Sequence, residues 1–91
     1  MTATKIRMMS GSENSMSLQE IDSIYVTGCD NPQFFKKAVI HDYLKEHPGS
    51  IVVNRYPYPE LIPRISSNGE KYVQSTANEY FVDNLLSLPR E

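Results

Sequence analysis

The 91-residue chain has room for a single domain with one modest core. Hydrophobic residues make up 40% of it and charged residues 22%, a composition that predicts a folded protein rather than a disordered one. Its net charge of -2 is spread without a long run of either sign. Neither duplex nucleic acid nor an anionic membrane is therefore the default partner.

The cysteine count and the absence of long apolar runs bear on the cellular compartment. The only cysteine, Cys29, cannot form an internal disulfide, and a secreted domain of this size normally needs several. Lys5 and Arg7 are followed by polar residues where a secretory signal would be apolar, and no run approaches the roughly eighteen apolar residues of a membrane span. We therefore expect a cytoplasmic protein with no membrane segment.

The first predicted elements are two strands separated by a polar loop. Thr4–Met9 and Asp22–Thr27 contain the β-branched, aromatic and alternating residues that are typical of strands. Residues 10–17 are rich in Ser, Gly, Glu and Asn, which predicts a flexible loop. Because side chains alternate along a strand, Tyr25 is expected to point away from the face shared by the two apolar residues that flank it.

The strongest local pattern predicts a helix over residues 32–47. Asn31 is a favourable N-cap, Pro32 suits the first helical position, and Pro48-Gly49 ends the pattern. On a helical wheel, the half expected to be buried contains Phe35, Val39, Ile40, Tyr43 and Leu44. The half expected to face water contains Lys37, His41, Asp42, Lys45 and Glu46.

A buried strand and a surface loop are predicted after the helix. Residues 50–54 include three consecutive β-branched residues, and the order strand, helix, strand permits a right-handed crossover with a parallel pair. Residues 56–59 read Tyr-Pro-Tyr-Pro. Because proline cannot donate to a β-ladder, this segment is expected in a loop or at a sheet edge.

Asn68-Gly69 predicts a two-residue hairpin turn between strands over residues 61–67 and 70–76. Such a turn places Ser67 opposite Glu70, Ile65 opposite Tyr72, and Arg64 opposite Val73. Residues 77–91 carry a high density of apolar side chains and are expected to pack on the core as a short helix or turn, with Asp83 as a candidate cap. The whole chain, residues 1–91, is thus expected to form a single α+β domain. In it, a sheet of about four strands packs on one central helix.

Three groups of residues have side chains that could take part in catalysis or metal binding. Cys29 before a helix could be a nucleophile, but it would need a histidine within hydrogen-bonding distance, and no histidine is close in sequence. His41 and His47 are six residues apart, on different faces of a helix, which argues against a shared metal ion. Asp42 and Glu46 are typical of a solvated charged face. We expect no catalytic residue, no cofactor and no metal.

The candidate binding surface is aromatic and basic. It contains Arg55, Tyr56, Tyr58, Arg64, Lys71 and Tyr72, with Tyr80 as a further candidate. The proline-stiffened residues 56–59 favour contact with another protein. Aromatic and basic side chains together are also typical of single-stranded nucleic-acid binding, which would use Arg55, Tyr56, Arg64, Lys71 and Tyr72. A third possibility is that the tyrosine rings pack into the core and have no binding role.

The C-terminal part of the sequence resembles a known family. Asn68-Gly69-Glu70-Lys71-Tyr72-Val73, followed by Asp83-Asn84-Leu85-Leu86-Ser87-Leu88-Pro89, is similar to the pattern of the bacterial domain-of-unknown-function family numbered three-eight-nine-two. The resemblance implies a small bacterial protein and no particular activity. We expect a non-catalytic protein-interaction or accessory module, with single-stranded nucleic-acid binding as the alternative, and the sequence leaves the oligomeric state open.

Overall fold

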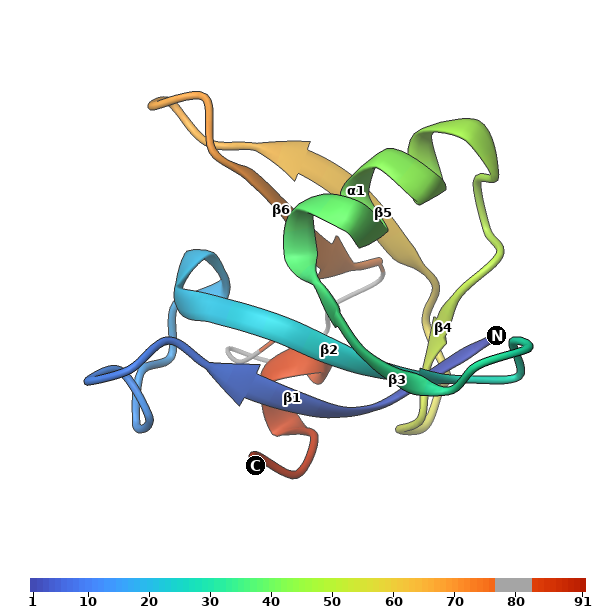
Figure 1. Ribbon diagram of the computed structural model, residues 1–91, viewed down its shortest axis with the longest axis horizontal. Coiled ribbons are helices and arrows are strands. Elements are labelled where there is room, and N and C mark those ends of the chain that lie inside the picture. The colour runs from blue at the N-terminus through green and yellow to red at the C-terminus, as the bar shows by residue number, and fades with distance from the viewer. Residues whose placement is uncertain (77–82) are drawn as a thin grey trace.

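The computed structural model describes residues 1–76 and 83–91, which form two sheets, one α-helix and two 3-10 helices (Figure 1). In chain order the elements are β1 (Thr2–Met8), η1 (Leu18–Glu20), β2 (Ile21–Thr27), β3 (Gln33–Lys36), α1 (Lys37–Glu46), β4 (Val52–Val53), β5 (Leu61–Ile65), β6 (Lys71–Ser75) and η2 (Asn84–Ser87). The α+β fold with one central helix, expected from the sequence, is confirmed.

The larger sheet has the strand order β3-β2-β1-β4. β2 pairs with β1 and β3 in antiparallel fashion, whereas β4 runs parallel to β1. The last residues of the chain pair with the same edge of β1 as β4 does. There the Ile6 N–H donates to the Pro89 carbonyl and the Glu91 N–H donates to the Ile6 carbonyl. The strand after the helix, β4, thus has the first strand of the chain, β1, as its parallel partner.

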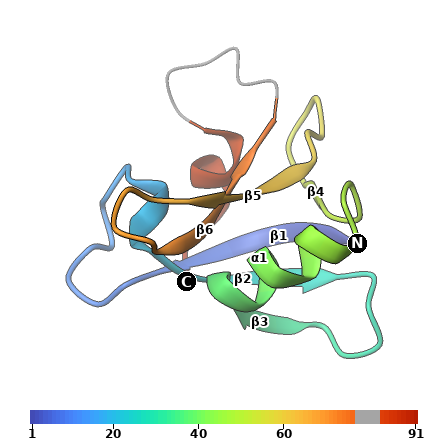
Figure 2. The ribbon, with the colours of Figure 1, turned by 90° about the horizontal axis from the view of Figure 1, so that it is seen from above.

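The helix and the β5–β6 hairpin lie side by side over this sheet, and the helix contacts both (Figures 1 and 2). Between them lies one continuous apolar core, to which the sheet, the helix, the hairpin and η2 all contribute. Its buried members are Ala3, Ile6, Met8, Ile21, Ile24, Val26, Ile40, Leu44, Ile51, Val53, Leu61, Val73, Leu85, Leu86 and Leu88.

The prediction of a helix beginning at Asn31-Pro32 is wrong at its N-terminal end. Residues 33–36 form β3, and the helix begins only at Lys37. Phe34 and Phe35 pair with Tyr25 and Ile24 of β2, and this gain in sheet pairing outweighs the local capping signal. The predicted end at Pro48-Gly49 is confirmed, since the helix ends at Glu46.

The predicted division of the helix into a buried and a wet half is also partly wrong. Ile40 and Leu44 are buried as expected, but Lys37 and His41 are buried too. Val39 and Tyr43, expected in the core, are 55% and 40% exposed. The reason is that the helix contacts the sheet on one side and the hairpin on another, so two of its faces are covered rather than one.

The hairpin forms where Asn68-Gly69 predicts it, but the register is shifted by one residue. Arg64 faces Tyr72 and Ile65 faces Lys71, instead of Val73 and Tyr72. The Ser66 N–H donates to the Glu70 carbonyl, and Gly69 has a φ of +81°. These features describe a three-residue loop with a left-handed glycine in place of the predicted two-residue turn.

Residues 83–91 pack on the core, where Leu85, Leu86 and Leu88 are buried. The 3-10 helix η2 in this segment is capped by the Asp83 carboxylate, which accepts from the Leu85 N–H at 2.9 Å. The same carboxylate accepts from the Ser75 hydroxyl at 2.7 Å, which ties the end of β6 to the start of η2. Tyr80, Phe81 and Val82 lie outside the described residues.

Candidate functional site

The loop between β4 and β5 presents two tyrosines to solvent. Tyr56 is 78% exposed and Tyr58 is 56% exposed, and their rings meet edge to face with centroids 6.1 Å apart. The backbone beneath them is hydrogen-bonded: the Tyr58 N–H donates to the Arg55 carbonyl at 2.7 Å, and the Val53 N–H donates to the Pro59 carbonyl at 2.8 Å. The loop thus holds an aromatic pair on a turn with defined geometry.

The other predicted binding residues lie on the hairpin and do not join this loop. Arg64 and Tyr72 face each other across the two strands. Lys71 instead points to the helix, where its ammonium group donates to the Asp42 carboxylate at 2.8 Å. The hairpin tip and the β4–β5 loop lie at opposite ends of the molecule (Figures 1 and 2). The six residues therefore occupy three separate places.

The surface of α1 that faces the hairpin is polar and structural. His41 is 2% exposed, and its Nδ1 lies 3.0 Å from the Asp42 Oδ1. Hydrogen bonds from Lys71 and, to a lesser extent, from His41 hold the pKa of Asp42 below its ordinary value. These side chains fasten the helix to β6, so this charged group is not simply the solvated face that the wheel predicts.

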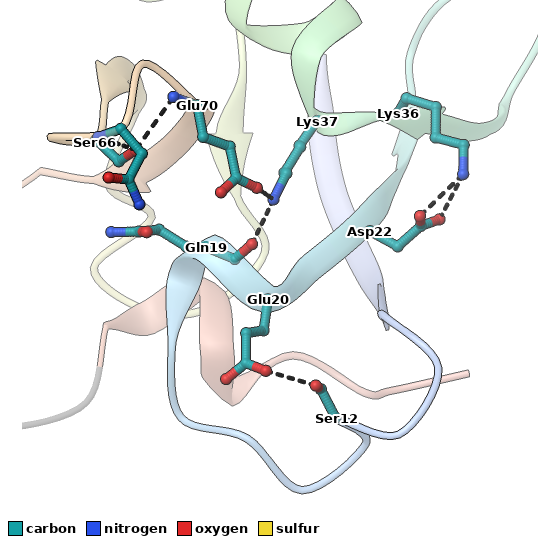
Figure 3. A network of polar contacts seen from close by, with 9 residues as sticks. Ser12, Gln19, Glu20, Asp22, Lys36, Lys37, Ser66 and Glu70 are labelled. Atoms are coloured by element: carbon teal, nitrogen blue, oxygen red, sulfur yellow. Dashed lines mark hydrogen bonds and ion pairs between the residues drawn. The ribbon is translucent and has the colours of Figure 1, made fainter.

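Lys37 makes a second polar connection between the helix and its surroundings (Figure 3). Its buried ammonium group donates to the Gln19 carbonyl and to the Glu70 carboxylate. A cation at a helix N-terminus opposes the helix dipole, and the Glu70 carboxylate compensates for it. This arrangement joins α1, η1 and the hairpin, which marks Lys37 as a structural residue.

Cys29 lines a small apolar pocket between the helix and the larger sheet. The pocket has a volume of about 220 Å³ and is lined by Met1, Val26, Cys29, Phe35, Val39, Ile40, Tyr43 and Ile51. The Cys29 Sγ lies 3.6 Å from the Val26 carbonyl oxygen, and the His47 ring packs against Tyr43. Within residues 1–76 and 83–91, no three His, Cys, Asp or Glu side chains gather in a way that could hold a metal ion.

A further surface, which the sequence reasoning did not single out, lies on the face of β1–β3 that points away from α1. We call it the open sheet face and define it by Lys5, Arg7, Tyr25, Phe34 and Lys36. The rings of Tyr25 and Phe34 meet edge to face at 5.2 Å. The Arg7 guanidinium carbon lies 4.0 Å from the Phe34 ring centroid, and the Lys5 Nζ lies 5.1 Å from that of Tyr25. Cations and aromatic rings thus alternate across three strands.

Two carboxylates accompany these cations. The Lys36 ammonium group donates to Asp22 at 2.9 Å (Figure 3), and Lys5 pairs with Glu91 at 3.0 Å. The hydrogen bond from Lys36 lowers the pKa of Asp22. The predicted outward orientation of Tyr25 and the alternation of Lys5 and Arg7 were the available signals for this face. The misassignment of β3 as helix concealed Phe34 and Lys36.

These features define a small α+β domain whose helix packs against both a mixed sheet and a hairpin. The chain belongs to the family described as Protein of unknown function (DUF3892), whose model matches residues 2–89. The resemblance first noted in the C-terminal part thus extends over nearly the whole chain. Comparisons with curated proteins and with solved structures give no match. Among the described residues, no helix is long and apolar enough to cross a membrane.

Proposed function

We propose that this protein is a non-catalytic interaction module that docks on another protein through the loop at Tyr56 and Tyr58. The observation that carries the proposal is the exposure of this ring pair, 78% and 56%, on a hydrogen-bonded turn. Tyrosine is enriched at protein interfaces and is among the residues that contribute most to binding.

The local backbone supports the same proposal. Pro57 and Pro59 restrict the chain on either side of Tyr58, and the two hydrogen bonds of the turn hold the backbone that carries the rings. A surface that is ordered before binding loses less conformational entropy when a partner docks. The rings also have polar hydroxyl groups, so they suit an interface that is apolar at its centre and wet at its rim.

The test compares the double variant Tyr56→Ala, Tyr58→Ala with the wild-type chain. Proteins retained from a cell lysate by each immobilised chain are identified, and each specific partner is then purified and titrated. We expect the double variant to bind a partner at least about tenfold more weakly, since two central aromatic contacts are removed. Tyr72→Ala, a tyrosine on the hairpin, is the matched control and should bind normally.

Folding is checked by thermal denaturation of each variant. Because both loop rings are exposed, the double variant should melt within a few degrees of the wild type. A variant that melts normally and still retains every partner of the wild type would remove this loop from the proposed interface.

A further inference from the structure

The open sheet face is independent of the tyrosine loop and has a different character. We infer that this face binds single-stranded nucleic acid, with bases stacked on Tyr25 and Phe34 and phosphates against Arg7, Lys5 and Lys36. The inference concerns another surface and another class of partner, so it goes beyond the proposed protein interface and does not depend on it.

The rings argue for a single strand rather than a duplex. Tyr25 and Phe34 are only partly buried, and they lie side by side on neighbouring strands with centroids 5.2 Å apart. Bases of a single strand can stack on such rings or on an arginine guanidinium plane, whereas the bases of a duplex are already stacked on each other. The Arg7 guanidinium group lies over the Phe34 ring, so a base stacks on Phe34 when this group turns toward a phosphate.

The charges argue for a polyanion. Three cations lie on this face, and among residues 1–76 and 83–91 two carboxylates, Asp22 and Glu91, pair with them. Arg7 has no carboxylate within 4.0 Å among the described residues, although its charge contributes to the lowered pKa of Asp22. The phosphates of a nucleic-acid strand can bind the Arg7 guanidinium group and can replace the carboxylates that pair with Lys5 and Lys36. The surface is thus complementary to phosphates spaced along an extended strand.

The experiment titrates the full chain into fluorescein-labelled oligonucleotides and follows anisotropy. The probes are single-stranded DNA and RNA of about 12 nucleotides and a duplex of the same length. We expect both single strands to bind at roughly 20 mM NaCl. If three phosphates are contacted, affinity should fall by about 100-fold at roughly 200 mM, because each contact adds about 0.7 to the slope of log K against log salt. The duplex should bind more weakly.

The variants separate the two kinds of contact. Arg7→Ala should weaken binding and reduce the salt slope by about 0.7, because one phosphate contact is lost. Phe34→Leu keeps an apolar side chain on β3 but removes the ring, so it should weaken binding by about 5- to 100-fold while the salt slope stays unchanged. A variant that merely failed to fold would lose both properties together.

The Glu91→Gln variant best separates a change in binding from a change in folding. It releases Lys5 from its carboxylate partner, so it should tighten binding severalfold, and a gain in affinity cannot result from misfolding. Arg64→Ala and Tyr72→Leu, which alter the cation and ring on the outer face of the hairpin, are matched controls and should bind like the wild type. The double variant at Tyr56 and Tyr58 should also bind oligonucleotides normally.

Several results would overturn the inference. Absence of binding at low salt would do so, as would equal affinity for the duplex. A loss of affinity in the hairpin variants as large as that of Arg7→Ala would place the contact elsewhere. If oligonucleotides do not bind and Arg7→Ala instead releases a protein partner, the open sheet face is a protein interface.

Discussion

The carboxylate of Asp42 is a useful probe of how single residues hold this fold together. Its pKa is lowered in the folded chain, chiefly by the hydrogen bond from Lys71. A lowered folded pKa means that the contribution to stability is complete above the unfolded pKa and is lost as the pH falls through the lower, folded one. The window therefore lies below about pH 4, where aspartate ordinarily titrates.

We predict that Asp42→Asn lowers the free energy of unfolding at neutral pH and that the difference from the wild type shrinks as the pH falls below about 4. Urea denaturation at steps from neutral to acidic pH measures it. Asp30→Asn, an exposed carboxylate in the loop before β3, is the control. A difference that stays constant down to the lowest pH would show that the Asp42 charge does not stabilise the fold.

The residues of α1 show why a helical wheel alone cannot predict which side chains are buried. The buried positions of Ile40 and Leu44 follow from periodicity alone, and they were predicted. His41 and Lys37 are polar, so a wheel assigns them to water. Their partners depend on the hairpin, which joins the helix from about thirty residues further along the chain. Its Glu70 pairs with Lys37, and its Lys71 pairs with Asp42, the carboxylate that His41 contacts.

At the scale of elements, the hairpin depends on Gly69. Its φ of +81° is a left-handed conformation, and apart from its chain neighbours no atom of the described residues lies within 4 Å of the position that a Cβ would take. The cost of a side chain here is therefore backbone strain rather than a clash. We predict that Gly69→Ala destabilises the chain by about 1 kcal/mol, because L-residues avoid this region.

Gly69→Asn is the matched variant. Asparagine adopts left-handed conformations more readily than alanine, so it should cost less. Thermal denaturation measures both, and a loss of about 1 kcal/mol corresponds to roughly 4–8 °C for a domain of this size. Equal stability of the glycine and alanine forms would show that the turn does not require the left-handed residue.

The N-terminal end of the helix illustrates how far local signals determine an element. Asn31 and Pro32 are good helix-starting residues, yet they lie in the loop that leads into β3. Phe34 and Phe35 gain strand pairing and contacts on opposite faces of the sheet, which no capping residue can match. Sheet partners outside the helical segment determine such cases, so local reasoning placed residues 37–46 in the helix correctly and residues 32–36 wrongly.

At the scale of the molecule, candidate surfaces depend on topology. The loop at Tyr56 and Tyr58 was predicted from the sequence, because its prolines cannot donate hydrogen bonds to a central strand. The open sheet face requires that Arg7, Tyr25 and Phe34 come together from three strands, which depends on the strand order β3-β2-β1. Sequence reasoning could place Tyr25 outward but had no means of bringing a ring from β3 beside it.

The C-terminal segment packs against both sheets, so it allows a test of whether the domain unfolds cooperatively. Leu85 is 0% exposed, and η2 contacts both β1 of the larger sheet and β6 of the hairpin. Truncating a side chain in this position leaves a cavity that neither element can fill alone. We predict that Leu85→Ala lowers the free energy of unfolding by about 2–5 kcal/mol. Ser87→Ala, an exposed position of the same 3-10 helix, should stay within about 0.5 kcal/mol of the wild type.

Urea denaturation followed by far-UV circular dichroism and by tyrosine fluorescence measures both variants. Because Leu85 belongs to the same continuous core as the sheet, the helix and the hairpin, the two signals should change together, with the midpoint lowered and the slope unchanged. If Leu85→Ala lost no more stability than Ser87→Ala, η2 would contribute little to the core. If the two signals separated, the sheet and the hairpin would unfold independently, and the terminal segment would not join them energetically.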